Sequence, residues 1–388
     1  MPFAASHSRA SNISDAIRSV TEEIRAGLGK AEPDFSFLFV SMDHADKFGQ
    51  LASRICEATG TKVLIGCTGE TVIGGSEEIE SGPALSVWSA MIPDAKIESF
   101  AVRFERTTDG IISSGLPAIP NEGTDMRAVF MLAEPFSSAP HTVLDHFDAE
   151  SSGVPIHGGM ASGGHRAGEN RLFHNSHEVK HGAVGLIVRG GPRVRSVVSQ
   201  GCRPIGKNYV VTAAEENVIQ ALGGAPPMQR LRELFDTLSD KDSELVQLGL
   251  HLGLVTNEYK ETFERGDFLI SNVVGADPGT GSIAVGTPVR VGQTVRFHVR
   301  DADTADEDLK SLLEADRAAN PAPAQAALLF SCNGRGTRLF PAAHHDASAI
   351  RAIHGPIPLA GFFAQGELGP ISGRNFVHGF TASIALFE

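Results

Sequence analysis

The chain has 388 residues, of which 41% are hydrophobic and 20% charged, so it contains enough apolar material for a sizeable core and too much for a disordered protein. Its formal net charge of -13 and its lack of any Lys/Arg run argue against general binding to nucleic acid or to an anionic membrane. No apolar stretch approaches the roughly 20 residues that cross a bilayer, so we expect a soluble, cytoplasmic protein.

The first part of the chain predicts a frayed segment over residues 1–10, followed by a helix that Ser14 or Asp15 caps. The apolar run 35–40 predicts a buried strand. The expected elements after it are a helix over about 44–59, a strand over 62–65 that leads into the glycine turn GCTGE (66–70), and strands over 84–88 and 96–104.

This layout recurs twice. The second copy has a strand at 128–132, a helix at 141–149, the turn GGMASGG (158–164) and strands at 183–188 and 194–200. The third has a strand at 327–332, a helical segment at 346–353, the turn GFFAQGE (361–367) and a strand at 381–387. Such spacing is typical of strand-helix-strand units, and its repetition indicates duplication followed by divergence.

The stretch between the second and third copies has a different pattern. It predicts helices at 214–222 and 228–238, then strands at 245–255, 268–274, 281–285 and 295–299, then a helix at about 304–315. The polar run 239–242 marks the expected domain boundary. We therefore expect an α/β protein with mixed sheets, built from internally repeated strand-helix-strand-glycine-turn-strand units.

The glycine turns favour two readings. Their glycines allow positive φ or close approach, and their backbone N–H groups can form an anion-binding nest. None matches the dinucleotide fingerprint G-x-G-x-x-G opening a helix, and no phosphate-binding G-x-x-x-x-G-K-[ST] loop is present. Tight turns against packed helices are the alternative to a ligand site.

Three charged residues accompany these turns. Glu70 and Glu367 occupy equivalent places in the first and third turns, where a carboxylate can hold a ligand's ammonium group or simply face solvent. Arg335 follows directly on a buried strand, where it can hold a ligand carboxylate or form a structural ion pair. A ligand site is expected where the first and third turns converge, with the second copy as structural spacing.

The four cysteines are far apart and form no CxxC pair, so neither a disulfide framework nor a metal site is signalled. Cys67 and Cys332 lie at strand ends, where a thiol with a nearby histidine can act as a nucleophile. No spacing marks such a histidine, and small buried cysteines are common.

Several ordered blocks resemble the FIST family, the F-box and intracellular signal transduction proteins. They are IGCTGE (65–70) with Gly74-Gly75, FLISNVVG (268–275), VGQTVRFHVRDA (291–302), LFSCNGRG (329–336) and GFFAQGELGP (361–370). The resemblance covers roughly 35–388 and implies a lead-in at 1–34, an N-terminal FIST region at 35–238 and a C-terminal FIST region at 239–388.

The resemblance implies a sensory module that binds a small ligand such as an amino acid, without a catalytic residue set. Placed on the matching blocks, the candidate ligand contacts are Gly66, Cys67, Thr68, Gly69, Glu70, Cys332, Arg335, Gly366 and Glu367. We expect no cofactor and no metal, and a signalling protein as the downstream partner. The alternatives are a cysteine-dependent enzyme using Cys332 or Cys67, and an interaction scaffold without ligand.

Overall fold

The computed structural model describes residues 2–108, 110–119, 125–263 and 265–388, and the chain divides into two compact units. Unit 1 comprises the described residues up to Ser199 together with Leu309–Val377 and Thr381–Glu388. Unit 2 comprises Gln200–Asp308 and His378–Phe380. Unit 1 is therefore discontinuous in sequence, since the chain leaves it and returns.

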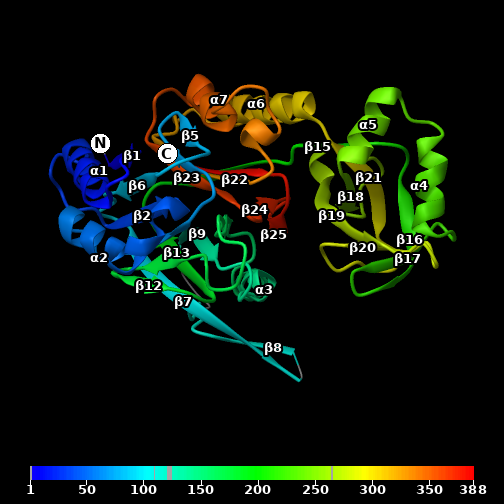
Figure 1. The fold of residues 1–388 in the computed structure, drawn as a ribbon, viewed down its shortest axis with the longest axis horizontal. Coiled ribbons are helices and arrows are strands. Elements are labelled where there is room, and N and C mark those ends of the chain that lie inside the picture. The colour runs from blue at the N-terminus through cyan, green and yellow to red at the C-terminus, as the bar shows by residue number, and fades with distance from the viewer. Residues whose placement is uncertain (1, 109, 120–124, 264) are drawn as a thin grey trace. The chain divides into compact units, whose positions relative to one another are not determined.

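Unit 1 contains three mixed sheets (Figure 1). The first has the order β1 (Phe3–Ser8), β6 (Leu85–Ala90), β2 (Phe35–Val40), β3 (Leu64–Thr68), β11 (Leu172–His174), β12 (His177–Val179). The second has the order β8 (Gly110–Ser114), β7 (Lys96–Thr107), β13 (Ala183–Arg189), β9 (Met126–Ala133), β10 (Ile156–Met160), β24 (Glu367–Ile371), β25 (Arg374–His378). The third has the order β14 (Val194–Ser199), β26 (Ala382–Phe387), β22 (Ala326–Cys332), β23 (Leu359–Ala364), β4 (Val72–Gly74), β5 (Glu77–Ile79).

The three sheets share one plan. In each, two parallel strands (β2–β3, β9–β10, β22–β23) lie at the centre, and an antiparallel strand (β6, β13, β26) flanks the first of them. The far edge of the second parallel strand is covered by a hairpin from another segment of the chain. Hairpin β11–β12 pairs with β3, β24–β25 with β10, and β4–β5 with β23. Each sheet is thus completed by residues distant in sequence; duplication itself stays a prediction.

A shared aromatic core holds the sheets together. Phe37 of β2 and Phe130 of β9 lie with ring centroids 5.2 Å apart, and Phe39 of β2 and Phe362 of β23 lie 5.3 Å apart. All four rings are fully buried. Because burying one such side chain contributes roughly 2–3 kcal/mol, this cluster is a main source of the stability of unit 1.

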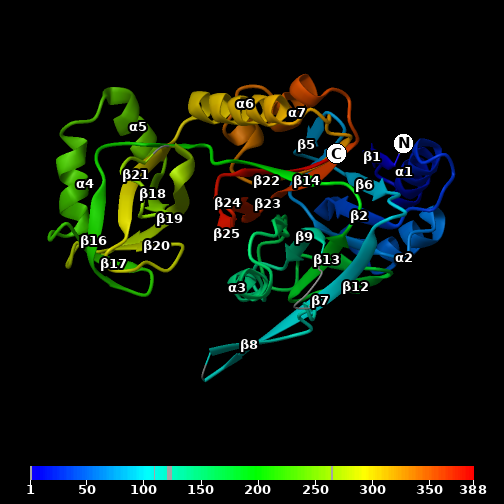
Figure 2. The same cartoon turned by 180° about the vertical axis from the view of Figure 1, so that it is seen from behind.

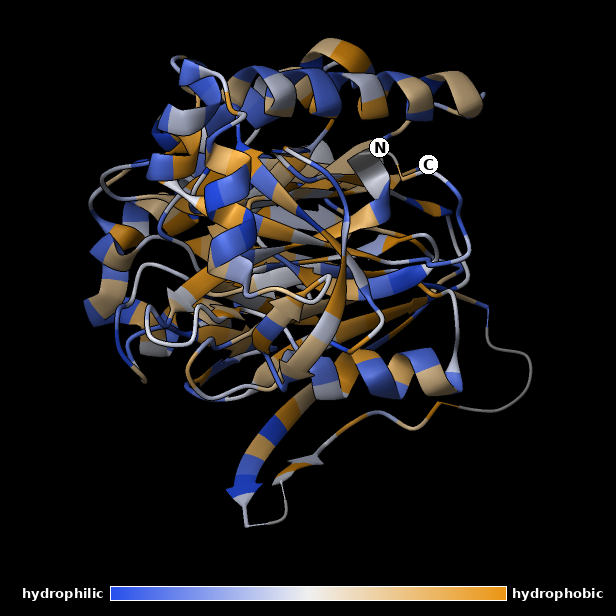
Figure 3. Cartoon of the chain, turned by 90° about the vertical axis from the view of Figure 1, so that its right-hand side faces the viewer, coloured by the Kyte–Doolittle hydropathy of each residue, from blue (hydrophilic) through white to orange (hydrophobic). Residues whose placement is uncertain are grey.

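Helices cover the outer faces of these sheets. They are α1 (Ile13–Gly27), α2 (Phe48–Thr59), α3 (Pro140–Glu150), α6 (Ala302–Ala319) and α7 (His345–His354), with short 3₁₀ turns at Met42–Lys47 and Gly336–Arg338. Figure 3 shows the helical ribbons striped in hydrophilic and hydrophobic colours, as expected for helices that bury one face. In α1 the buried face includes Ile17, Val20 and Ile24, which lie on one side at helical spacing.

Unit 2 is a closed antiparallel barrel. Its strands pair in the order β21 (Thr294–Arg300), β16 (Tyr209–Glu215), β17 (Val218–Leu222), β20 (Ile283–Val285), β19 (Phe268–Ala276), β18 (Leu250–Val255), and β18 pairs back to β21. Strand β15 (Cys202–Pro204) adds to β21. Helices α4 (Pro227–Phe235) and α5 (Asp240–Leu248) contact barrel strands, and a 3₁₀ turn covers Arg265–Asp267 (Figure 2).

The predicted α/β class with mixed sheets is confirmed, while several local predictions were wrong. The frayed start is strand β1, because Phe3 is buried against Trp88 and the strand pairs along its length with β6. The cap of α1 is Asn12, whose side chain accepts the N–H groups of Ser14 and Asp15.

The predicted helix at 214–222 is wrong as well. These residues form the end of β16, a turn and β17, with Glu216 at φ 50° and Ile219 and Leu222 buried in the barrel. The start predicted for the 245–255 strand is also wrong, since 245–248 belong to α5. The domain boundary between 238 and 239 stays a prediction. No helix among the described residues combines the length and apolarity needed to cross a bilayer.

Glycine at the third position of β3, β10 and β23 lets the parallel strands approach closely. A Cβ at Gly66, Gly158 or Gly361 would lie 2.3, 1.9 or 1.8 Å from the carbonyl oxygen of Leu38, Met131 or Leu329. Such distances are far inside van der Waals contact, and the obstructing atoms are backbone.

We predict that Gly361→Ala lowers the free energy of unfolding by about 3 kcal/mol, because either β22 or β23 must shift. Urea denaturation followed by circular dichroism measures the change. Gly266→Ala is the matched control, since a Cβ there meets nothing within 4 Å. Equal stability of the two variants would contradict this role for Gly361.

Candidate functional site

The three predicted glycine turns begin earlier than their true positions, since 66–68 belong to β3, 158–160 to β10 and 361–364 to β23. The segments that follow these strands meet at one place in unit 1, and Ser162 of the second joins them. The Ser162 N–H donates to the Thr68 carbonyl at 3.1 Å, and the Glu70 N–H donates to Ser162 Oγ at 2.8 Å. Ser162 Oγ also donates to the Phe363 carbonyl, at the end of β23. The second turn therefore bonds directly to both of the others.

Further backbone bonds fasten the third turn. The Gln365 N–H donates to the Met160 carbonyl at 3.0 Å, and the Met160 N–H donates to the Gly366 carbonyl at 2.8 Å. The Phe363 N–H donates to the Thr71 carbonyl at 2.9 Å. Many of the N–H groups expected to form anion nests are thus used between turns.

A fully buried ion pair lies beside this junction. Arg335 donates through Nε and Nη2 to the two carboxylate oxygens of Asp346, at 2.7 and 2.8 Å. Asp346 also accepts from Ser331 Oγ at 2.7 Å and from His345 Nδ1 at 2.9 Å. Burial alone would raise the pKa of Asp346, but the guanidinium and these donors hold it well below its usual range.

One nitrogen of the Arg335 guanidinium is not paired with another described residue. Its Nη1 is buried and has no hydrogen-bond partner among the described residues, while the ring of Phe340 lies 5.1 Å from the guanidinium carbon. A buried donor without a partner costs about 1–3 kcal/mol, so its presence calls for an explanation.

Two buried carboxyl groups carry raised pKa values nearby. Burial raises the pKa of Glu367 to about 8, although the Thr381 N–H donates to its Oε2 at 3.0 Å and the Cys332 side chain also bonds to it. Burial and the charge of Asp346 raise the pKa of Glu78 to about 8, although the Ala347 N–H donates to its Oε1 at 2.9 Å. Both groups are therefore largely protonated at neutral pH.

The outer side of the cluster is polar and accessible. Glu70, whose side chain is 33% exposed, forms an ion pair with Arg338, which is 57% exposed. Glu80 accepts the Thr337 N–H at 2.9 Å. Cys332 is half-buried, and the Gly334 N–H donates to its sulfur at 3.4 Å.

The structure thus brings Glu70, Cys332, Arg335 and Glu367 into one cluster. Gly66, Cys67, Thr68 and Gly69 lie fully buried behind it, and Gly366 anchors the third turn. Burial raises the pKa of the Cys67 thiol well above its usual value, which argues against Cys67 as a nucleophile.

Sequence reasoning missed Ser162, Asp346, Glu78 and Arg338. Ser162 lies in the second turn, which was expected to have only a structural role. Its bonds to the first and third turns become visible only in the three-dimensional structure. Glu78 belongs to a segment far from Arg335 in sequence, and Asp346 follows Arg335 by 11 residues without a spacing pattern that links the two. Arg338 lies in the short turn after the recognised LFSCNGRG block, three residues beyond Arg335.

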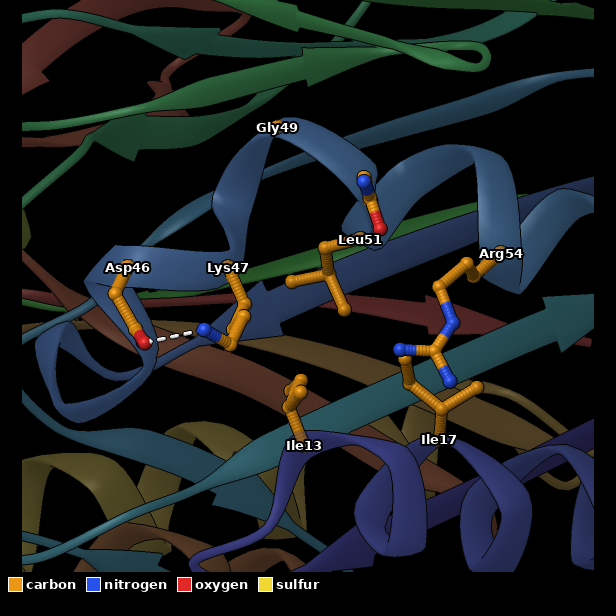
Figure 4. Close-up of a pocket in the computed structure, with 8 residues that line it drawn as sticks. Ile13, Ile17, Asp46, Lys47, Gly49, Leu51 and Arg54 are labelled. Carbon is orange, nitrogen blue, oxygen red and sulfur yellow. Dashed lines mark hydrogen bonds and ion pairs between the residues drawn. The ribbon is translucent and has the colours of Figure 1, made fainter.

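A separate pocket of about 450 Å³ lies between α1 and α2 (Figure 4). Ile13 and Ile17 line it from α1, and Leu51 and Arg54 from α2. Its Asp46–Lys47 pair is exposed, and none of the residues expected from the sequence lines it. We therefore place the candidate site at the turn junction. No group of three or more potential metal ligands gathers anywhere in the described ranges.

Comparison with known proteins agrees with the recognised blocks. A family model described as the FIST N domain matches residues 34–225, and one described as the FIST C domain matches residues 227–370. An uncharacterized protein of Mycobacterium tuberculosis (strain ATCC 25618 / H37Rv) is 41% identical over 380 residues, covering 98% of each chain. An uncharacterized protein of Mycobacterium bovis (strain ATCC BAA-935 / AF2122/97) is 42% identical over 365 residues, covering 94% of this chain and 93% of the other.

The raised pKa of Glu367 predicts a pH-dependent effect of Glu367→Gln. Between the ordinary glutamate pKa and about 8 the folded state binds more protons than the unfolded state, so this group's contribution to stability falls as pH rises. The glutamine variant has no carboxyl group to titrate, so it does not lose stability in this way. The free energy of unfolding of the variant minus that of wild type should therefore rise by up to about 1.4 kcal/mol per pH unit over this window.

Denaturation at a series of pH values measures the difference. Glu22→Gln, on the exposed side of α1, is the control and should show no such trend. A difference between Glu367→Gln and wild type that stays constant with pH would contradict the protonated state of Glu367.

Proposed function

The chain belongs to the FIST family, and we propose that it is a non-enzymatic sensory protein that binds a small ligand, such as an amino acid, at the junction of its three glycine turns. FIST domains are generally taken as small-ligand-binding domains of signal transduction. The observation that carries the proposal is the group of buried polar atoms left without partners beneath an accessible polar edge.

The atoms in question are Arg335 Nη1, Asn333 Oδ1 and Glu78 Oε2, each without a hydrogen-bond partner among the described residues. They supply both donor and acceptor character around the buried Arg335–Asp346 ion pair. A small zwitterion supplies the complementary groups, with its carboxylate toward the arginines and its ammonium toward Glu70. Because Asp346 already occupies two donors of Arg335, the ligand carboxylate is expected to bind mainly through Arg338.

The wider setting of the proposal follows from charge. We propose a cytoplasmic role with a signalling protein as partner, and the formal net charge of -13 argues against nucleic acid or an anionic membrane as the partner. Neither a cofactor nor a metal enters the proposed binding mode.

A panel of amino acids and related metabolites, tested by thermal unfolding, examines the proposal. A ligand at about 100 times its Kd should stabilise the protein by roughly 2.7 kcal/mol. We expect Arg338→Gln to remove this shift while leaving the unliganded stability within about 0.5 kcal/mol of wild type, because the side chain is exposed.

Arg18→Gln is the matched control, since Arg18 is an exposed arginine paired with Asp15 on α1. It should leave the ligand shift intact. If a ligand raises the unfolding temperature of wild type and of Arg338→Gln equally, the proposed site is refuted. If no compound of a broad panel raises the unfolding temperature of wild type, binding of a ligand of this class is refuted.

A further inference from the structure

The pocket between α1 and α2 has two unlike walls (Figure 4). On α1, Ile13 and Ile17 are one helical turn apart and line the pocket together. On α2, Gln50 and Arg54 have the same spacing and also line it. Leu51 of α2 belongs to the same apolar cluster as the two isoleucines, and all three are buried. One volume of about 450 Å³ is therefore bounded by an apolar wall and a polar wall.

Arg54 carries the charge that distinguishes this pocket. The residue is half-buried, and Figure 4 shows its side chain reaching from α2 toward Ile17. It forms no hydrogen bond or ion pair with any residue that the structure describes. Lys47, which also lines the pocket, is already paired with Asp46 at 2.6 Å. Arg54 thus brings a positive charge without a protein partner into the cavity.

The cavity continues along the groove between the two helices. A second hollow of about 420 Å³ shares Ile17 and Arg54 with the first and extends to Thr21 and Ala58. Arg18 lines this second hollow, but it already forms an ion pair on α1. Because Arg54 borders both hollows, a ligand with a charged group at Arg54 can extend an apolar part along Ile17.

Charge and shape together indicate the class of ligand. A guanidinium binds a carboxylate through two parallel N–H groups. One arginine without a partner matches a single negative charge, so a monocarboxylate fits better than a phosphate dianion. Pockets of roughly 300–1,000 Å³ with an apolar lining and a few polar groups are typical small-molecule sites. The isoleucine wall is suited to an aliphatic tail.

We propose that the groove between α1 and α2 binds a small monocarboxylate with an aliphatic tail. Arg54 holds the carboxylate, the Gln50 amide supplies a further donor at the rim, and Ile13 and Ile17 contact the tail. This second site shares no residue with the turn junction. The inference goes beyond the ligand binding proposed there and does not depend on it.

The test titrates the full chain with sodium octanoate and measures Kd by isothermal titration calorimetry. Octan-1-ol has the same tail without the charge, and acetate has the charge without the tail. We expect octanoate to bind at least about tenfold more tightly than either probe, because it alone uses both walls. Equal affinity for octanoate and octan-1-ol would overturn the role of Arg54, and absence of octanoate binding would overturn the site.

The role of Arg54 is tested with Arg54→Gln, which should weaken octanoate binding by at least about tenfold. Arg54→Lys keeps the charge without the planar fork, so it should lose less affinity. Arg25→Gln is the matched control, since Arg25 is an exposed arginine of α1 that lines neither hollow. Unchanged octanoate affinity in Arg54→Gln would contradict the proposal.

Nuclear magnetic resonance of isoleucine methyl groups locates the ligand without any variant. Octanoate should change the chemical shifts of the Ile13 and Ile17 methyl groups. Ile73 is a buried isoleucine of β4 that lines neither hollow, and its methyl shifts should stay unchanged. Shift changes at other isoleucines, with none at Ile13 and Ile17, would place octanoate elsewhere and overturn the proposal.

These outcomes are distinct from those of the amino-acid panel. Arg338→Gln should remove the thermal shift caused by an amino acid and leave the octanoate Kd unchanged. Arg54→Gln should weaken octanoate and leave the amino-acid shift unchanged. Failure of either site therefore leaves the other measurable, and loss of both ligands in one of these variants would contradict two separate sites.

Discussion

The open edge of a parallel strand is the constraint on which unit 1 depends. A row of unpaired backbone groups at the edge of β3, β10 or β23 would be costly beside a buried core. Each edge is covered by a hairpin supplied from another segment of the chain. Each hairpin follows a glycine turn along the chain, although residues 165–171 separate the second turn from β11. The same pairing that closes the sheets therefore draws the three turns to one place. The candidate site is therefore a product of how the edges are covered.

The second constraint is the burial of charge next to those turns. A buried ion pair contributes little net stability over an apolar substitute, yet removing one partner leaves an uncompensated charge at a cost of about 3–5 kcal/mol. Arg335 and Asp346 hold each other in this way, with Ser331 and His345 completing the shell of Asp346. Burial raises the pKa of Glu78 and of Glu367, which favours their neutral forms and so limits the net charge of the cluster.

The elements of the core were largely predictable from sequence, since runs such as Phe35–Val40 and Ala326–Cys332 are continuous apolar strands at regular spacing. The edges were not. Strand β1 contains Ala-Ala-Ser-His and owes its conformation to pairing with β6, and β4 and β5 are three residues each. Residues 214–222 looked helical in isolation, and burial of Ile219 and Leu222 in a barrel outweighs that local preference.

The site was predictable in the same partial way. Glycine turns and a following Glu or Arg can be seen in one stretch of sequence. The partners of Arg335 and Glu367 cannot, because Asp346, Glu78 and Thr381 reach them through three-dimensional packing. A single sequence carries no signal for which buried carboxyl group pairs with which arginine. Burial of Cys67 and half-exposure of Cys332 likewise follow from packing, although both lie at strand ends.

The exchange of hairpins also bears on how such a chain acquires its structure during synthesis. Strand β23 pairs with β4 across nearly 300 residues, as Gly74 with Ala360 shows, and β26 at the very end flanks β22. Contacts of such sequence separation carry a large loop-closure entropy and slow folding. The N-terminal hairpin β4–β5 emerges from the ribosome long before its partner strand exists. Until the last strands are made, the nascent chain exposes unpaired edges, a state in which chaperone binding and aggregation compete with folding.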